Sequence, residues 1–533
     1  MEGLATERLP LAIGSPSFVD RNKIFSQNGR FLNVKLMLMY PFAQLEDGQY
    51  RGLLRNLTKS APSVEIIALN FSRDGHGERW LQRDLYTRLL VDLAALGRRA
   101  VLEESSLITN LIHDDCFPKL LVEANKLLNR QDFSGTFRYQ EREVEIRFRL
   151  RAIFYLLGLV KPGLIVFPIT PHLIDDYLLY FVAKRREIPI LFFQPVSIIP
   201  ALLPRSAIDE VFLASHESRE KYTLESGFGV RASDLVKRFE QGTPPKYMSR
   251  QETSSRLAHK LSGRVRTLSF SLRWLFSPRF PASSDFTGLV GGRLWFNLAR
   301  QVLLRGLQSG LQGAMRGLSD DWDPGKKYAV FALHYEPERT SFPEGGPFVF
   351  QGDIIEVLRT LLPPDVTLYV KEHRSQGSPS LRGFLGRSPL FYSLVDSLPN
   401  TRALSADIDT VDLLRNAVCV FTITGTVAIE CAARGIPVGY FGNPWWEGMP
   451  GSIKISNATS YEEIEAVERA NKFNLESFLD ELVQAKLIHG IGAEDPRDYE
   501  ARHGTLPVGF EQRAERSLAE TILLEVRKLR KDR

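Results

Sequence analysis

Two separate blocks of the chain alternate short apolar runs with segments of helical spacing, and this alternation constrains the fold more than any other feature. Apolar runs separated by helices are typical of parallel strands whose two faces are both covered by the connecting helices. The first block extends to about residue 236, and the second spans about 326–470. The sequence therefore predicts an α/β protein with two Rossmann-like domains that face a cleft, where ligands bind beyond the carboxyl ends of the strands.

The expected elements can be placed along both blocks. Strands are predicted at 34–40, 64–69, 164–168, 188–193, 210–215, 327–333, 366–371, 417–422 and 436–441. Helices are predicted at 85–96, 119–128, 176–186, 353–362 and 427–434, and a mostly helical tail at 471–533, amphipathic over 510–530.

Composition excludes several classes of protein. The chain has 533 residues, of which 44% are hydrophobic and 25% charged, so it is long enough for several domains and too apolar to be disordered. It has three cysteines and no CxxC pair, which argues against a disulfide scaffold and a structural zinc site. No apolar run reaches the ~18–20 residues of a spanning helix, and the N-terminus does not resemble a secretory signal. A cytoplasmic protein is predicted, with peripheral attachment to the inner membrane as an option.

A basic segment at 237–325 separates the two blocks. From Lys237 to Arg316 it carries 14 Lys and Arg against three acidic residues, with aromatic residues interleaved. A helical linker with a solvated basic face accounts for this composition, and so does a segment, 237–316, that lies on an anionic membrane. Nucleic-acid binding is a third interpretation, but it rests on this segment alone, and no nucleic-acid partner is predicted.

The run HYEPERT at 334–340 directly follows the strand expected at 327–333. It brings an imidazole (His334), two carboxylates (Glu336 and Glu338) and a guanidinium to a carboxyl strand end. Either glutamate could act as a general acid or base if its pKa were raised. The alternative is a polar surface loop with an ion pair.

A second polar cluster follows the strand expected at 366–371. Lys371, His373 and Arg374 place two cations and an imidazole at that strand end. Lysine supplies a point charge and arginine a planar fork, so the cluster suits a phosphate or a carboxylate. No His or Cys lies at metal-ligand spacing, and no metal is predicted.

A third cluster links the strand expected at 417–422 to the following helix. Gly425 permits a tight turn, and Thr424 and Thr426 bring hydroxyl groups to the start of the helix, which favours an anion there. Glu430 lies one turn into the helix and could accept hydrogen bonds from ligand hydroxyls. Helix capping by threonine is the simpler alternative, and the lack of a GKS or GKT sequence excludes a Walker A loop.

The three clusters together describe a nucleotide-sugar site, in which cations stabilise a departing phosphate. The second block also resembles the bacterial capsule polysaccharide synthesis family over about 326–450. The matching runs are LHYEPERT at 333–340, LYVKEHRSQ at 368–376 and TITGTVAIE at 422–430, with GIP at 435–437 and FG at 441–442. A weaker similarity covers 171–189.

That family includes the β-Kdo transferases of capsule assembly, which resemble type-B glycosyltransferases and use CMP-activated sugars. The resemblance implies donor contacts for Lys371, His373, Thr424, Gly425, Thr426 and Glu430. Arg374 stands where the family usually has proline, and this extra cation also suits a diphosphate donor such as a UDP-sugar.

The first block is then expected to bind the acceptor. His172, Asp175 and Asp176 follow the strand expected at 164–168 and are candidates for the acceptor base, and Gln194 is a further cleft residue. Capping of the next helix is the alternative role of the two aspartates.

The predicted function is a glycosyltransferase of surface (capsular) polysaccharide biosynthesis that moves a sugar from a nucleotide donor, with CMP-Kdo favoured, to a glycan or lipid-linked acceptor, without a cofactor. A sugar-nucleotide epimerase or hydrolase and a non-catalytic assembly or export protein are the alternatives. The predicted catalytic residues are Glu336, Glu338, His373, Asp175 and Asp176. The predicted donor-binding residues are His334, Lys371, Arg374, Thr424, Gly425, Thr426 and Glu430.

Overall fold

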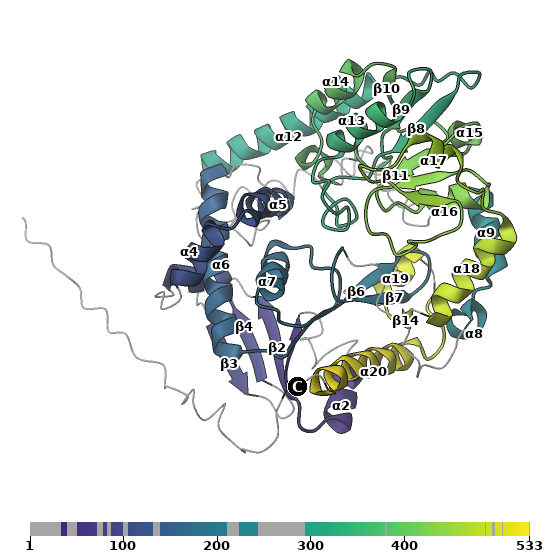
Figure 1. The fold of residues 1–533 in the computed structure, drawn as a ribbon. Helices are drawn as coiled ribbons and strands as arrows, with labels where there is room; N and C mark the ends of the chain where they lie inside the picture. Colours follow the sequence, from purple (N-terminus) through teal and green to yellow (C-terminus); the bar gives the residue numbers. More distant parts are fainter. Residues whose placement is uncertain are drawn as a thin grey trace, which may run out of the picture.

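The computed structural model contains two β-sheets, each flanked by helices (Figure 1). It describes residues 34–39, 51–71, 78–82, 87–99, 105–131, 139–209, 223–242, 294–378, 381–485, 487–492, 496–503 and 505–531. The chain forms two Rossmann-like α/β domains, as the alternation of strands and helices predicts.

The first sheet has eight strands in the order β14-β7-β6-β5-β1-β2-β4-β3. Its central strands β6, β5, β1, β2 and β4 are parallel, and β3, β7 and β14 add antiparallel edges. The strands are β1 Lys35–Met39, β2 Glu65–Phe71, β3 Glu78–Gln82, β4 Thr87–Val91, β5 Leu164–Phe167, β6 Ile190–Val196, β7 Ala201–Arg205 and β14 Ile488–His489.

The second sheet has six parallel strands in the order β10-β9-β8-β11-β12-β13. Counted along this domain the order is 3-2-1-4-5-6, which is that of a dinucleotide-binding Rossmann sheet. The strands are β8 Tyr328–Ala332, β9 Thr367–Lys371, β10 Thr401–Leu404, β11 Val420–Thr422, β12 Val438–Tyr440 and β13 Ser452–Lys454.

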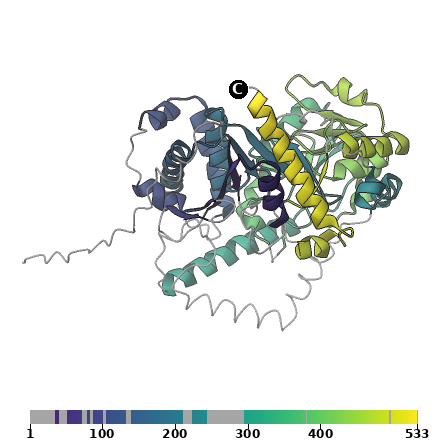
Figure 2. The ribbon, with the colours of Figure 1, turned by 90° about the horizontal axis from the view of Figure 1, so that it is seen from below.

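Helices cover both faces of the first sheet. One face packs against a group of helices that supply most of its core: α3 Leu93–Arg99, α4 Ser105–Ile112, α5 Cys116–Gln131, α6 Tyr139–Val160 and α7 Ile174–Arg185. The other face packs against α2 Arg51–Ser60 and α20 Phe510–Lys531. Figure 2 shows α20 lying along α2, so the end of the chain closes the first domain.

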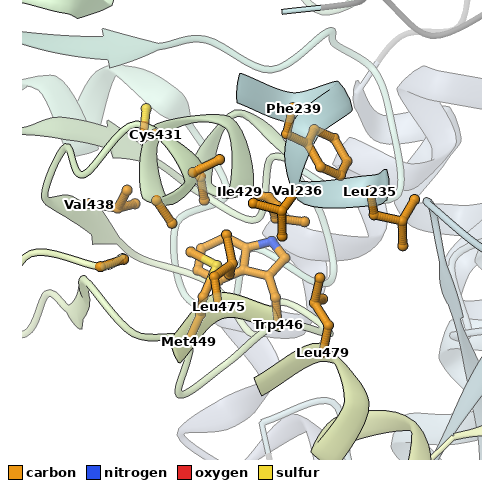
Figure 3. Packing of buried hydrophobic residues seen from close by; sticks show 14 of the residues in the cluster. Leu235, Val236, Phe239, Ile429, Cys431, Val438, Trp446, Met449, Leu475 and Leu479 are labelled. Carbon is orange, nitrogen blue, oxygen red and sulfur yellow. The ribbon is translucent and has the colours of Figure 1, made fainter. Parts of the chain in front are cut away.

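The second sheet is covered in the same way. One face packs against α8 Leu224–Phe228, α9 Ala232–Glu240, α16 Val427–Ala433 and α18 Lys472–Ala485. Trp446 is fully buried among side chains of the last three helices (Figure 3). The other face packs against α12 Leu294–Arg316, α13 Gln351–Leu361, α14 Pro389–Ser397 and α17 Tyr461–Glu465. The remaining helices are η1 Gly383–Leu385, α15 Thr410–Arg415 and α19 Pro496–His503.

The packing of two segments differs from the domain boundaries expected at 236 and 471. Helices α8 and α9 precede residue 242, yet they pack against α16 and α18 beside the second sheet. Residues 488–531 follow the second domain in sequence, yet they belong to the first domain, because β14 pairs with β7 and α20 packs on α2. The chain therefore crosses between the domains twice, once between β7 and α8 and once between α18 and β14, burying apolar surface on each domain.

The predicted strands that lie within the described residues match β1, β2, β5, β6, β8, β9, β11 and β12, whereas β3, β4, β7, β10, β13 and β14 were not predicted. The helix predicted at 85–96 is wrong, since Thr87–Val91 is strand β4 and the helix begins only at Leu93. Alternate residues of β4 are buried, and the strand pairs with β2 and β3, which a short apolar run alone cannot indicate. The strand predicted at 210–215 and residues 243–293 of the basic segment lie outside the described residues.

Among the helices described above, none has both the length and the apolar character that crossing a membrane requires.

Candidate active site

The second sheet reverses its strand order between β8 and β11, and the loops that follow these two strands meet at that point. Ligands of open α/β sheets bind at such a reversal, beyond the carboxyl ends of the strands. His334 follows β8, and Thr424 follows β11. Two of the predicted clusters therefore lie side by side at the place where this fold positions its ligands.

His334 joins the two loops. The backbone N–H of Thr424 donates to Nε2 of His334 (3.2 Å), and the Thr422 hydroxyl lies 3.1 Å from the same nitrogen. Because a backbone N–H can only donate, Nε2 accepts and the ring proton is on Nδ1, which faces Oγ1 of Thr340 at 3.4 Å. Burial lowers the pKa of His334 to about 4, with a smaller contribution from Arg387. The ring is therefore neutral at physiological pH.

Glu338 lies at the end of this hydrogen-bonded chain. The Thr340 hydroxyl donates to Oε2 of Glu338 (3.0 Å), so a proton path connects His334, Thr340 and Glu338. Glu338 remains accessible to solvent. Surrounding protein atoms nevertheless raise the pKa of its carboxyl, against the opposing effects of Arg339 and Thr340. An accessible carboxylate with a raised pKa is suited to take up and release a proton.

Glu336 has a different environment, although it is only two residues away. It is buried, and its Oε1 accepts a hydrogen bond from Nζ of Lys126 on α5 (3.0 Å). Gln376 holds its backbone on both sides, at 2.9 Å from the N–H and 2.9 Å from the carbonyl. These contacts make Glu336 part of an ion pair between the domains, and we leave it out of the reacting groups.

The loop after β9 presents two donors. Ser375 N–H donates to Nδ1 of His373 (3.1 Å), so the ring proton is on Nε2. Burial, reinforced by His334 and by nearby cations, lowers the pKa of His373 to about 3, so the ring acts as a neutral N–H donor. Arg374 is exposed and, within the described part of the chain, has no hydrogen bond or ion pair.

Lys371 is turned away from these donors. Its side chain is buried, and Nζ donates to the carbonyl of Ala406 (3.2 Å). Burial lowers its pKa to about 8, and Arg374 adds to the shift. The structure thus separates Lys371, which is engaged by the backbone, from Arg374, which is free to meet an anion.

The turn after β11 is held by its own side chains. Thr424 Oγ1 donates to the Thr340 carbonyl (2.9 Å), and Gly425 N–H donates to Thr422 Oγ1 (3.2 Å). A Cβ at Gly425 would lie 2.6 Å from that oxygen, so the turn requires glycine. Thr426 precedes α16 without capping it through its side chain. Thr424 Oγ1 and the Gly425 N–H are thus engaged within the protein, and the predicted anion contact at this turn stays a prediction.

Glu430 lies on α16, close to the charge of Arg374. Burial raises the pKa of its carboxyl, and Arg434 and Arg374 oppose that shift. Its Oε2 lies 3.8 Å from Nη1 of Arg434. The charge of Arg374 reaches this carboxyl, and the predicted contact of Glu430 with ligand hydroxyls stays a prediction.

The first domain meets this site through the loop after β5. Thr170 Oγ1 donates to Oε1 of Glu344 (2.6 Å), and Arg339 pairs with the same carboxylate. Nδ1 of His172 lies 2.9 Å from the carbonyl of Thr170, so it carries the proton and Nε2 keeps a free lone pair. Burial lowers the pKa of His172, and Arg130 and Arg339 lower it further.

The other predicted acceptor residues lie elsewhere. Asp175 is buried and pairs with Arg149, and Leu173, not an aspartate, is the N-cap residue of α7. Asp176 lies in the first turn of that helix. Gln194 Nε2 donates to the carbonyl of Asn443 (3.1 Å), which joins the two sheets. Asp175 and Gln194 thus have structural partners, whereas the ring of His172 lies within reach of the charge of Arg339 in the loop after β8.

The sequence prediction missed the contribution of α5. Lys126 on this helix holds Glu336, and Arg130, one turn later, lies near Glu338, Arg339 and Glu344. Two basic residues four apart near the end of an amphipathic helix were the available signal, but such pairs are usually solvated.

No group of three or more His, Cys, Asp or Glu side chains in the described ranges is arranged to hold a metal ion.

Comparisons with known proteins yield weak structural similarities. No family model and no curated protein sequence matches the chain. Two KpsC structures from Thermosulfurimonas dismutans, a beta Kdo 2,7 transferase and a beta Kdo 2,4 transferase, are each 12% identical, with TM-scores of 0.22 and 0.25. They cover 62% and 60% of this chain and 88% and 79% of their own.

Two further structures extend over more of the chain. Trehalose-6-phosphate from E. coli bound with UDP-2-fluoro glucose is 11% identical, covers 84% of this chain and 94% of its own, and has a TM-score of 0.24. UDP-GlcNAc 2-epimerase from Methanocaldococcus jannaschii is 12% identical, covers 88% and 99%, and has a TM-score of 0.19. Similarity at this level identifies no activity, so the functional assignment rests on the residues of the site.

Proposed function

We propose that the chain is a glycosyltransferase that moves a sugar from a nucleotide-activated donor to a hydroxyl of a glycan or lipid-linked acceptor. One observation carries the proposal. Glu338, an accessible carboxylate with a raised pKa, is positioned by His334 and Thr340 where the strand order reverses. This combination supplies a base beside the place where the fold positions a ligand.

In the proposed reaction, Glu338 takes the proton of the acceptor hydroxyl as that oxygen forms a bond to the anomeric carbon of the donor sugar. The bond between this carbon and the phosphate oxygen breaks, and the nucleotide leaves with the electron pair. The N–H of His373 and the guanidinium of Arg374 stabilise the charge that develops on the phosphate. His373 suits this role because it stays neutral and donates from Nε2.

The donor is proposed to be a CMP-sugar such as CMP-Kdo, from the sequence resemblance of 326–450 to the capsule family. Arg374, exposed and unpaired among the described residues, also suits the second phosphate of a UDP-sugar. A role in surface polysaccharide synthesis, and a cytoplasmic location, follow from the same resemblance.

Peripheral attachment to the inner membrane belongs to the same proposal. Helix α12, at the end of the basic segment, exposes Val302, Leu303 and Leu307 beside Arg305. Exposed apolar side chains next to cations are typical of a helix that rests on an anionic membrane surface. No nucleic-acid partner and no cofactor are proposed.

The test is a nucleotide-release assay with CMP-Kdo, UDP-glucose and UDP-N-acetylglucosamine, each with and without a bacterial glycolipid extract. The proposal predicts release that depends on the acceptor for one donor and is lost in Glu338→Gln. Release or sugar isomerisation without acceptor would favour the hydrolase or epimerase alternative. The absence of turnover with every donor would favour a non-catalytic assembly protein.

A further inference from the structure

Arg130 on α5 is a partly buried cation whose charge no described residue neutralises by contact. Its Nη1 is inaccessible to solvent and has no hydrogen-bond partner, and no described residue forms an ion pair with it. Burial lowers the pKa of Arg130 to about 10, so the guanidinium stays charged at physiological pH. A desolvated charge without a partner is costly, and an anion bound to it would offset part of that cost.

The position of Arg130 is fixed from three sides. Lys126, one turn earlier on α5, pairs with Glu336 of the second domain, and Asn129 Nδ2 donates to the carbonyl of Leu385 at 2.5 Å. Gln131 Oε1 accepts from the N–H of Ile174 (2.8 Å), which ties the same end of α5 to α7. These contacts fix the end of α5 that carries Arg130, and preorganised groups bind more tightly than mobile ones.

The charged and polar neighbours of Arg130 differ from those of the proposed donor contacts. The charged or polar groups that act on it are Glu338, Arg339, Glu344 and Tyr335. Those that act on His373 are His334, Lys371, Arg387 and Arg374. The two sets share no residue, and they adjoin at Tyr335, whose ring lies 6.2 Å from the ring of His373.

His172 completes the arrangement on the first-domain side. Its Nε2 carries a free lone pair, and the charges of Arg130 and Arg339 both reach its ring. Arg339 is already paired with Glu344, which leaves Arg130 as the cation of this group that lacks a contact partner among the described residues. Both Arg130 and His172 retain partial solvent exposure, so a ligand can reach them.

We propose that Arg130, beside His172, binds an anionic substituent of the acceptor, a carboxylate or a phosphate monoester, close to Glu338. A guanidinium matches both groups because its planar N–H donors pair with two oxygens at once. The acceptor would then be a sugar acid or a phosphorylated sugar. The anion site stands without the transfer reaction, whereas its assignment to the acceptor rests on the proposed function.

Binding measurements test the site without any turnover. Calorimetric titration of the full chain uses D-glucuronate and inorganic phosphate as probes and neutral D-glucose as the matched control ligand. Arg130→Gln is expected to weaken glucuronate binding at least tenfold, whereas Arg374→Gln and the exposed Arg415→Gln leave it unchanged. Glucuronate binding that is unaffected in Arg130→Gln, or lost in Arg374→Gln, would overturn the proposal. Inorganic phosphate is expected to bind at two sites. Arg130→Gln should remove one of them, and Arg374→Gln the other.

Two further measurements distinguish ligand binding by Arg130 from a purely structural role and from a contact with the donor sugar. If Arg130 is held for a ligand, Arg130→Gln should unfold at the same urea concentration as the wild type or a higher one; a lower midpoint would mark it as a structural residue. CMP-Kdo and CMP should each bind equally to Arg130→Gln and to the wild type. A loss confined to CMP-Kdo would place the anionic group on the donor sugar and overturn the acceptor assignment.

Discussion

The loops after β8 and β9 leave neighbouring strands of one sheet, yet they use their polar side chains in opposite ways. In the first loop, His334, Thr340 and Glu344 all bond to protein partners, from β11 to the first domain. In the second, the exposed Arg374 and Nε2 of His373 have no protein partner among the described residues. The contacts of the first loop hold Glu338 in place, whereas Arg374 and His373 of the second loop are available to bind a ligand.

This contrast shows why one carboxylate of the first loop is a candidate base and its neighbour is not. Glu338 ends the hydrogen-bonded chain and stays accessible, whereas Glu336 is buried against Lys126 of the other domain. A loop that is fixed at Glu336 can present Glu338 precisely, because the side chains are only two residues apart. The predictions that follow test the two roles and the contribution of the second loop.

The largest effect is expected from Glu338→Gln. Removing the proposed base should lower the rate of acceptor-dependent nucleotide release by about 10²–10⁴-fold, the usual contribution of a general base. Nucleotide affinity, measured by calorimetry, should stay unchanged because Glu338 makes no proposed contact with the nucleotide. A variant that keeps wild-type turnover would remove Glu338 from the mechanism.

The second loop is tested by His373→Ala. Loss of the N–H donor should slow nucleotide release by about 10²-fold, as for other donors that stabilise developing charge. His373→Gln, which keeps an N–H at a similar distance, should recover part of the rate. Because the pKa of His373 is about 3, neither variant should change the pH profile between pH 5 and 8. If the wild-type pH–rate profile has a limb between pH 5 and 8 that both His373 variants lack, His373 titrates in that range, contrary to this expectation.

Glu336→Gln tests the fixed end of the first loop. Breaking its pair with Lys126 should lower the free energy of unfolding by about 2 kcal/mol, less than for a fully buried pair since the Lys126 side chain is 19% exposed. Urea unfolding measures the change, and Lys126→Met in the same chain should recover part of it. Equal stability of Glu336→Gln and wild type would contradict the structural role.

The smallest effect is expected from Thr340→Val, which keeps the shape of the side chain and removes its hydroxyl. The hydrogen bond from Thr340 lowers the pKa of Glu338, so its loss should raise that pKa further. The base works only when ionised, and the acidic limb of the pH–rate profile should therefore move to higher pH. Thr340→Ser should keep the wild-type profile. An acidic limb at the wild-type pH in Thr340→Val would contradict the proposed hydrogen bonding from Thr340 to Glu338.

Much of the fold could be predicted because the apolar strand runs of the second domain are short, buried and separated by helices. The exchange of elements between the domains could not, since β14 and α20 pack on strands and helices several hundred residues earlier. The strand β4 was mistaken for a helix because its apolar spacing over a few residues fits both structures.

The site could be predicted in outline, from polar clusters that directly follow strands. What the sequence could not distinguish was Glu336 from Glu338, because the deciding partner, Lys126, lies 210 residues away. The same holds for Lys371, whose amine is taken by the carbonyl of Ala406 rather than left for a ligand. Arg130 could not be predicted as a binding residue, because only the folded structure shows that its Nη1 has no hydrogen-bond partner.

The most direct test of the account is calorimetric titration of wild type, Glu338→Gln and Arg374→Gln with CMP, CDP, UDP, GDP and ADP. We expect one nucleotide to bind wild type and Glu338→Gln with equal affinity and to bind Arg374→Gln about tenfold more weakly or worse, as for loss of a charged hydrogen bond. Equal binding by all three proteins would contradict the assignment of the second loop to the donor phosphate, and the absence of binding by wild type would contradict the nucleotide site itself.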